Sequence, residues 1–194
     1  MHRTPLLKIL EAYQPIDDVD AAQRDRIVQF VRSEPRCFER SLAAGHITGS
    51  GWLIDRTARR VLLTHHAKLD KWLQLGGHAD GDPDTLRVAI REAHEESGLT
   101  DIVPLSAEIF DLDVHWIPQR SDVPAHLHYD IRFLLQARGS DDHVKSDESH
   151  ELRWFNLEEL ADFPVGQSVR RMCEKWRVYI QGEEQRHSAS GTRS

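Results

Sequence analysis

Three glutamates, Glu92, Glu95 and Glu96, stand three and four positions apart in a stretch with helical signals. In a helix, this spacing places their side chains on one shared face. Carboxylates crowded in this way repel one another and destabilise a helix by roughly 0.2–0.5 kcal/mol per pair. A hard divalent cation such as Mg²⁺ takes oxygen ligands and would reverse the sign of that interaction. A solvated helix face without any ligand is the alternative interpretation.

A loop rich in glycine and aspartate precedes the glutamates, from Gly76 to Asp82. Its glycines would let the backbone approach a ligand closely. Asp82 is expected to be the N-cap of the helix, with Pro83 at the first helical position and Gly98 as the residue with positive φ at its end. A buried stripe is predicted from four apolar residues at helical spacing, namely Leu86, Ala89, Ile90 and Ala93.

This loop and helix resemble the signature of the Nudix hydrolases. The matching residues are Gly77, Arg91, Glu92, Glu95, Glu96, Gly98 and Leu99. Two positions depart from the signature, because Pro83 stands where it has its first glutamate and Ala93 is smaller than its usual aliphatic residue. The loop Gly-His-Ala-Asp-Gly-Asp is similar to that of a sub-group with a helical N-terminal extension. The resemblance therefore spans about residues 4–180.

The resemblance implies attack of water on phosphorus in a nucleoside diphosphate derivative, a small-molecule substrate. The metal ligands would be the Gly76 carbonyl, Glu92, Glu95 and Glu96, holding one to three Mg²⁺ or Mn²⁺ ions. Glu92 matches the glutamate that either binds metal through water or acts as the base. Arg91 resembles the arginine that holds this glutamate in place, and an ordinary ion pair between Arg91 and Glu95 is the alternative.

A further catalytic carboxylate in this family usually comes from a loop after the signature. Glu151 precedes Trp154 by three residues, which is the spacing common in the family, and Glu148 is the second candidate. Plain surface charge is the alternative for both residues. The sequence does not assign the general base among Glu92, Glu148 and Glu151.

Histidines form a second constellation. His126, His128 and Asp130 alternate along a predicted strand, so their side chains share one face and could reach one ligand together. His78 lies in the glycine-rich loop. Imidazoles could hydrogen-bond a phosphate or supply softer metal ligands, which makes His78, His128 and Asp130 candidate substrate-binding residues. A polar sheet face with no fixed ligand is the alternative.

The order of predicted elements is typical of an α/β protein, and the resemblance implies the Nudix-type α/β/α sandwich with a mixed β-sheet. Residues 1–40 are expected to form an N-terminal helical hairpin, with Asp18 or Asp20 capping its second helix. Residues 41–181 would be the Nudix domain, and the polar residues 182–194 a disordered tail. Within the domain, strands are expected over 46–55, 60–66, 102–115, 125–137 and 151–156, and helices over 157–162 and 169–180.

Composition limits the class of partner. The net charge of −7 argues against a general nucleic-acid-binding surface. Cys37 and Cys173 are far apart in the sequence and are expected to be reduced thiols of a cytoplasmic protein. The sequence has neither the apolar run of a signal peptide nor that of a membrane span, so no membrane partner is expected. The N-terminal helices could serve a homodimer contact.

Three functions are compatible with these features. The favoured one is a metal-dependent hydrolase that cleaves a diphosphate linkage in a nucleotide derivative. An isomerase with the Nudix fold, such as isopentenyl-diphosphate isomerase, needs a cysteine facing the acidic site, for which Cys37 is the candidate. A non-catalytic nucleotide-sensing domain typically loses glutamates of the signature, whereas Glu92, Glu95 and Glu96 are all present. The sequence does not identify the nucleotide.

Overall fold

The computed structural model describes residues 2–119, 123–147 and 149–191. Two helices, α1 (Thr4–Ala12) and α2 (Asp18–Ser33), precede a mixed sheet. The strands are β1 (Gly45–Ile54), β2 (Arg60–His66), β3 (Lys71–Leu73), β4 (Leu75–His78), β5 (Ile102–Pro104), β6 (Asp111–Ile117), β7 (His126–Ala137) and β8 (Ser149–Asn156). The other helices are α3 (Thr85–Ser97), α4 (Leu157–Asp162) and α5 (Gln167–Gly191).

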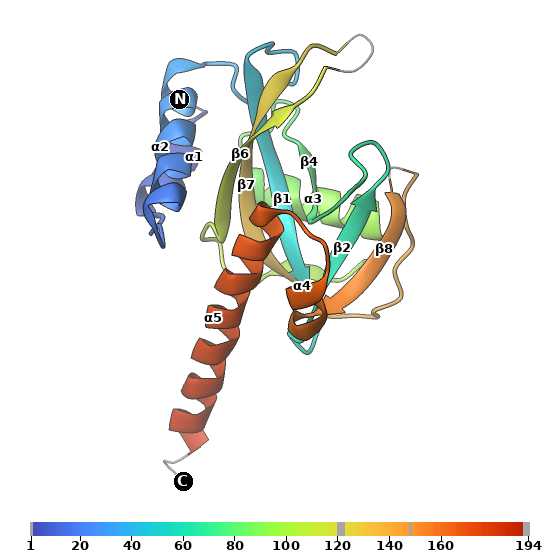
Figure 1. The fold of residues 1–194 in the computed structure, drawn as a ribbon. Helices are drawn as coiled ribbons and strands as arrows, with labels where there is room; N and C mark the ends of the chain where they lie inside the picture. Colours follow the sequence, from blue (N-terminus) through green and yellow to red (C-terminus); the bar gives the residue numbers. More distant parts are fainter. Residues whose placement is uncertain (1, 120–122, 148, 192–194) are drawn as a thin grey trace.

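Strand β1 is the centre of the sheet (Figure 1). It runs parallel to β7 along its whole length and antiparallel to β2 and β4. Strand β7 extends the sheet to β5 and β6, while β2 extends it to β3 and β8. The parallel register places His46 beside His128, Thr48 beside Asp130 and Ser50 beside Arg132. The predicted mixed sheet is therefore confirmed.

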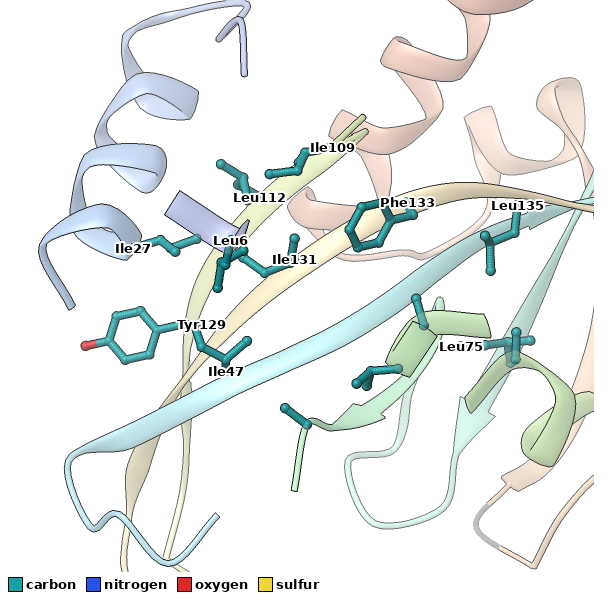
Figure 2. Packing of buried hydrophobic residues seen from close by; sticks show 14 of the residues in the cluster. Leu6, Ile27, Ile47, Leu75, Ile109, Leu112, Tyr129, Ile131, Phe133 and Leu135 are labelled. Carbon is teal, nitrogen blue, oxygen red and sulfur yellow. The ribbon is translucent and has the colours of Figure 1, made fainter. Parts of the chain in front are cut away.

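Helices cover both faces of this sheet. On one face, Ile47, Ile131 and Phe133 belong to a core that also includes residues of α1, α2 and α3 (Figure 2). On the other face, Trp52 packs against Trp176 of α5, with ring centroids 6.0 Å apart. Alternate residues of a strand point to opposite faces, so the apolar, odd-numbered residues of β7 meet the first core, as the sequence predicts.

A stacked ring pair and several polar contacts tie the N-terminal helices to the rest of the molecule. Phe30 stacks on Tyr129 of β7, with centroids 3.8 Å apart. Asp20 accepts hydrogen bonds from the Tyr13 hydroxyl at 2.8 and 2.7 Å and from Lys175 Nζ of α5 at 3.0 Å. The helical hairpin is thus confirmed. The domain boundaries near residues 40 and 181 stay predictions.

Both predicted helix caps are wrong by one to three residues. Helix α3 begins after Asp84, which accepts the backbone N–H of Arg87 at 3.1 Å, while Asp82 pairs with the Arg87 side chain instead. Helix α2 begins after Asp17 rather than after Asp18 or Asp20, because the Asp20 carboxylate is engaged by Tyr13 and Lys175. The predicted end of α3 is confirmed, since Gly98 has a φ of 69°.

The single strand predicted over 102–115 is wrong. Two short strands, β5 and β6, occupy this stretch, and both pair with β7. The chain leaves the sheet between them. Leu105 donates to the Leu134 carbonyl and Phe110 to the Arg132 carbonyl, so five residues of this segment span only two residues of β7. Pro104, which has no N–H to donate, ends β5.

Helix α5 is longer than predicted. It runs to Gly191 rather than ending near Ile180, so it includes residues 182–191 of the segment expected to be disordered, and residues 192–194 lie outside the described part. Within the described residues, no helix is both long enough and apolar enough for a membrane crossing.

Candidate active site

The three glutamates lie on α3, which packs against β1 and β4. Glu96 is 9% exposed, and its Oε1 accepts a hydrogen bond from the backbone N–H of Gly76 at 2.8 Å. Glu95 is exposed. The structure therefore brings the helix and residues 75–78 together and orders one of the carboxylates against them; these residues form strand β4, where the sequence predicted a loop from Gly76 onward. We refer to Glu92, Glu95 and Glu96 as the carboxylate set.

Glu92 occupies space that a side chain at position 77 would fill. A Cβ atom built on Gly77 would lie 2.4 Å from Glu92 Oε2. Arg91 Nη2 donates to Glu92 Oε1 at 2.6 Å and to the His78 carbonyl at 2.9 Å. The contact with Glu92 raises the pKa of the Arg91 guanidinium. Arg91 thus joins the loop to the carboxylate set, while its Nε lies farther, 3.8 Å, from Glu95 Oε1.

The donor atoms of this region are all oxygens. Glu92 and Glu96 lie against a strand whose backbone carries the Gly76 carbonyl, and Glu95 is an exposed carboxylate of the same helix. Carboxylate and carbonyl oxygens are the ligands that Mg²⁺ takes in proteins. The chemistry of the donor set therefore fits a hard divalent cation.

The segment expected to supply a further carboxylate is only partly placed near α3. Val144, in the loop before β8, donates its backbone N–H to the carbonyl of Ser97 at the end of α3, at 2.8 Å. Glu151 is exposed on β8, opposite His65 of β2. Glu148 lies outside the described residues. The loop thus reaches the end of the helix, and the catalytic roles of Glu151 and Glu148 stay predictions.

Asp130 is buried within the sheet, with 1% of its surface exposed. Its carboxylate accepts hydrogen bonds from Thr48 at 2.8 Å, Ser50 at 2.7 Å, Gln74 at 3.1 Å and Arg132 at 2.7 Å. Ser50 is in turn the sheet partner of Gly76. In this structure Asp130 joins β7 to β1 and to the segment before Gly76, and a contact with substrate stays a prediction.

Three histidines from three strands meet on the same sheet face as Asp130. His46, His78 and His128 each offer a ring nitrogen, and these atoms lie within 4.8 Å of one another. We call these residues the histidine cluster. Sequence reasoning found His78 and His128 but not His46, which neighbours His128 only through the parallel register of β1 and β7.

Two rings of the cluster, those of His46 and His128, are favoured in the neutral form by their surroundings. Burial, together with the neighbouring rings of His78 and His126, lowers the pKa of His46 to about 4. Burial and the ring of His115 strongly lower the pKa of His128 as well. Because neutral imidazole carries a lone pair, both residues can act as acceptors or ligands near neutral pH.

Comparison with known proteins places this geometry in a family. A model described as the NUDIX domain matches residues 46–175, which is more than half of the chain. No curated protein matches the chain in sequence.

Solved structures with a similar fold come from several organisms. A Caenorhabditis elegans Ap4A hydrolase in a binary complex has a TM-score of 0.56 at 17% identity, covering 70% of this chain and 98% of that one. A MutT protein from Methanosarcina mazei has a TM-score of 0.54 at 20% identity, with coverages of 70% and 95%. The NUDIX domain of Shewanella oneidensis NrtR, complexed with ADP ribose, has a TM-score of 0.51 at 15% identity, with coverages of 78% and 97%. At these identities the likeness shows the fold.

Proposed function

The chain belongs to the NUDIX family, and we propose that it is a pyrophosphohydrolase that cleaves a diphosphate linkage in a nucleotide derivative with Mg²⁺ or Mn²⁺. One observation carries the proposal: two members of the carboxylate set lie against the glycine-rich strand, with Glu96 bound to the Gly76 N–H and Glu92 in the space that Gly77 leaves. The names of the similar structures, an Ap4A hydrolase and a MutT protein, agree with a nucleotide substrate.

The proposed metal ligands are ordered by neighbouring groups of the protein. Glu92, Glu95, Glu96 and the Gly76 carbonyl would hold one to three ions, which when bound neutralise the charge of the diphosphate and favour ionisation of water. The hydrogen bond from Gly76 orders Glu96, and the contact with Arg91 orders Glu92. These contacts prepare the carboxylates before a ligand arrives, which reduces the reorganisation needed for catalysis.

The general base is one of Glu92, Glu151 and Glu148. Glu92 is favoured by its contact with Arg91, because a base must be held in position to accept a proton from the attacking water. Substrate contacts of His78 and His128 stay predictions from the sequence, and Asp130 would act through the residues that it positions.

The isomerase alternative has little support in this structure. Cys37 is fully buried, and burial raises the pKa of its thiol to about 11. Burial likewise raises the pKa of Cys173 to about 11. A nucleophilic or acid–base cysteine needs an accessible, ionisable thiol, and neither residue offers one. A sensing domain remains the second alternative, and it would bind a nucleotide without cleaving it.

The test is a release assay on a panel of nucleoside-diphosphate compounds. The panel holds nucleoside-diphosphate sugars, ADP-ribose, dinucleoside polyphosphates and nucleoside triphosphates, each with Mg²⁺ and with Mn²⁺. We expect metal-dependent cleavage of one class. Glu96→Gln should lower this rate by about 100-fold or more at limiting metal, because even outer partners of a metal site change affinity by about 10- to 100-fold. Glu158→Gln, an exposed carboxylate on α4, is the matched control.

Cleavage of none of the compounds by a protein that binds Mg²⁺ would contradict the hydrolase and favour the sensing domain. A second variant, Glu92→Gln, separates ligand from base. If Glu92 acts as the base, its loss persists at saturating Mg²⁺, whereas the loss caused by Glu96→Gln is partly recovered. Recovery of Glu92→Gln at high Mg²⁺ would assign Glu92 to metal binding and move the base to Glu151 or Glu148.

A further inference from the structure

The histidine cluster is assembled by the register of three neighbouring strands. Strand β1 lies between β4 and β7 (Figure 1). His46 of β1 is paired with His128 of β7, and Thr48, two residues farther along the same face of β1, is paired with His78 of β4. The ring centroid of His46 lies 5.0 Å from that of His78 and 4.8 Å from that of His128. The three rings therefore converge because the strand pairing fixes their backbones.

His46 is the unusual member of this cluster. It is 2% exposed, and among the described residues neither of its two ring nitrogens has a hydrogen-bond partner. Leaving a buried polar group unsatisfied is unfavourable, and most such groups in folded proteins have a partner. A buried imidazole with unpartnered nitrogens, facing two other imidazoles, points to a ligand that accepts a lone pair.

The chemistry of the donors identifies that ligand. Three imidazole nitrogens suit Zn²⁺ and its neighbours in the first transition row, whereas Mg²⁺ prefers oxygen. Metal ligation uses the lone pair of a neutral imidazole, and neither ring nitrogen of His46 has a hydrogen-bond partner among the described residues. We propose that His46, His78 and His128 form a binding site for a divalent transition-metal ion of the Zn²⁺ class.

This site would be separate from the carboxylate set. A Cβ atom on Gly77 would point at Glu92, so the side-chain direction at position 77 faces α3. The adjacent residue of a strand points to the opposite face, which places the ring of His78 on the face that carries Asp130. The carboxylates of α3 and the ring of His78 thus lie on opposite faces of β4.

The dimensions of the cluster suit a transition-metal ion after a small adjustment. Zn–N bonds of about 2.0–2.1 Å in a tetrahedron place the ligating nitrogens about 3.3 Å from one another. The nitrogens lie within 4.8 Å of one another, and rotations of the side chains can close the difference while the strands keep their register. Three histidines leave a fourth position for water or another ligand.

Two further histidines surround the site. His126 Nε2 lies 3.1 Å from His128 Nε2, and its Nδ1 lies 2.8 Å from the Pro124 carbonyl. The ring of His115 packs edge-on against His128 and its Nδ1 lies 3.0 Å from Asp113 Oδ2. Partners of this kind orient metal-ligating histidines in known sites. His126 and His115 are therefore positioning residues for His128.

The bound ion would connect β4 to β1 and β7 close to Gly76, the backbone position proposed to bind the catalytic metal. Its expected role is structural, because His46 is buried. The occupied site would stabilise the segment from Gly76 to His78, which also carries the contact between the His78 carbonyl and Arg91.

The experiment titrates chelator-treated full-length protein with Zn²⁺ in competition with a chromophoric chelator, and with Co²⁺ followed by visible absorption. We expect one equivalent of Zn²⁺, intense Co²⁺ bands typical of four-coordinate geometry, and no displacement of Co²⁺ by millimolar Mg²⁺. His46→Leu and His128→Gln should each weaken Zn²⁺ binding by about 100-fold or more, since a lost ligand exceeds the roughly 10- to 100-fold effect of an outer partner. His150→Asn, which changes an exposed histidine of β8, is the matched control and should bind Zn²⁺ as the wild type does.

Circular dichroism and thermal unfolding of each metal-free variant establish that it is folded, and His78→Gln replaces any variant that is not. Zn²⁺ should raise the melting temperature of the wild type and of His150→Asn but not that of His46→Leu. The proposal is overturned if the wild type takes up no Zn²⁺ at micromolar concentrations, or if folded His46→Leu binds it with unchanged affinity. These readouts do not use hydrolysis, so their failure is distinguishable from failure of the proposed enzyme activity.

Discussion

Two groups of carboxylates in this molecule have opposite surroundings. Asp111, Asp113 and Asp130 lie on β6 and β7 around Arg132, which is buried and donates to them at 2.9, 3.2 and 2.7 Å. Two cations of α5, Arg171 and Lys175, also reach Asp111. We call these six residues the ionic network. In the carboxylate set of α3, Arg91 contacts Glu92, and Glu95 is exposed.

This difference shows how the same residue type can serve structure or ligand binding. In the ionic network the chain supplies the compensating cations, so the acidic groups are satisfied once the protein has folded. In the carboxylate set one member, Glu95, is exposed, and the oxygen donors fit a divalent ion. Removing one partner from a buried ion pair leaves an uncompensated charge, whereas removing a carboxylate from a crowded helix face relieves repulsion. Variants in the two regions should therefore behave differently.

The largest effect is expected for Arg132→Met. This change removes the cation shared by Asp111, Asp113 and Asp130, and it should destabilise the fold by about 3–5 kcal/mol because buried charges are left uncompensated. Urea unfolding followed by circular dichroism measures the loss. Arg32→Met, which removes an exposed pair with Glu11, should change stability by less than about 1 kcal/mol. Equal losses of stability in Arg132→Met and Arg32→Met would contradict a special role of the ionic network relative to an exposed ion pair.

Acid should weaken the ionic network next. Burial opposes ionisation of Asp113, but the hydrogen bond from His115 and the charge of Arg132 outweigh it and hold its pKa well below the usual range. The pKa of Asp111 is also lowered, against the effect of burial, by Arg171 and Arg132. A carboxyl with a lowered folded-state pKa contributes stability above its unfolded pKa of about 3.9, and that contribution is lost as the pH falls further.

Each such group contributes a slope of up to about 1.4 kcal/mol per pH unit. Because the unfolded carboxyls are only partly protonated at pH 4, two groups should cost roughly 2 kcal/mol between pH 4 and pH 3, measured as free energy of unfolding in urea. In Asp113→Asn, the pH dependence of the free energy of unfolding should lose the contribution of one of the two carboxyls. An unchanged slope in this variant would show that Asp113 is not linked to acid unfolding.

A smaller effect, confined to activity, is expected for Gly77→Ala. The new Cβ would lie 2.4 Å from Glu92 Oε2, so the end of this flexible side chain must move. Misplacing a catalytic group by about 1 Å can lower the rate by up to about 100-fold, and we expect a loss of about 10- to 100-fold with little change in melting temperature. The matched control is Gly166→Ala, where nothing lies within 4 Å of the new atom. Full activity of Gly77→Ala would remove Glu92 from the site.

The carboxylate set could be predicted from sequence because it is local. Its residues fall within one stretch, 76–96, where helical spacing alone places the glutamates on one face. Local sequence patterns also predicted the bounds of β7 and α4 to within one residue. The capping errors at α2 and α3 arose where neighbouring aspartates offered nearly equivalent caps. Which aspartate is used depends on partners elsewhere, such as Lys175 for Asp20.

The ionic network and His46 could not be found in the same way. Asp130 lies beside Thr48 only because β1 and β7 are parallel and in that register, and a polar residue in a strand pattern does not say which strand will pair with it. The division between β5 and β6 has a similar cause. The apolar stretch 102–115 could form one strand by its composition. Its pairing with β7 decides where β5 ends and where β6 begins.

The smallest expected effect concerns Mg²⁺ and Glu95. Without metal, Glu95→Gln should change stability by less than about 0.5 kcal/mol, because repulsion from Glu92 and attraction to Arg91 nearly cancel. At ten times its dissociation constant, an ion that binds only the folded state adds about 1.4 kcal/mol. Thermal unfolding should therefore show Mg²⁺ stabilising the wild type and Glu158→Gln, but stabilising Glu95→Gln less at the same concentration. Equal stabilisation of all three would place the ion away from Glu95, and the exposed carboxylate would then resemble any other surface charge rather than a ligand.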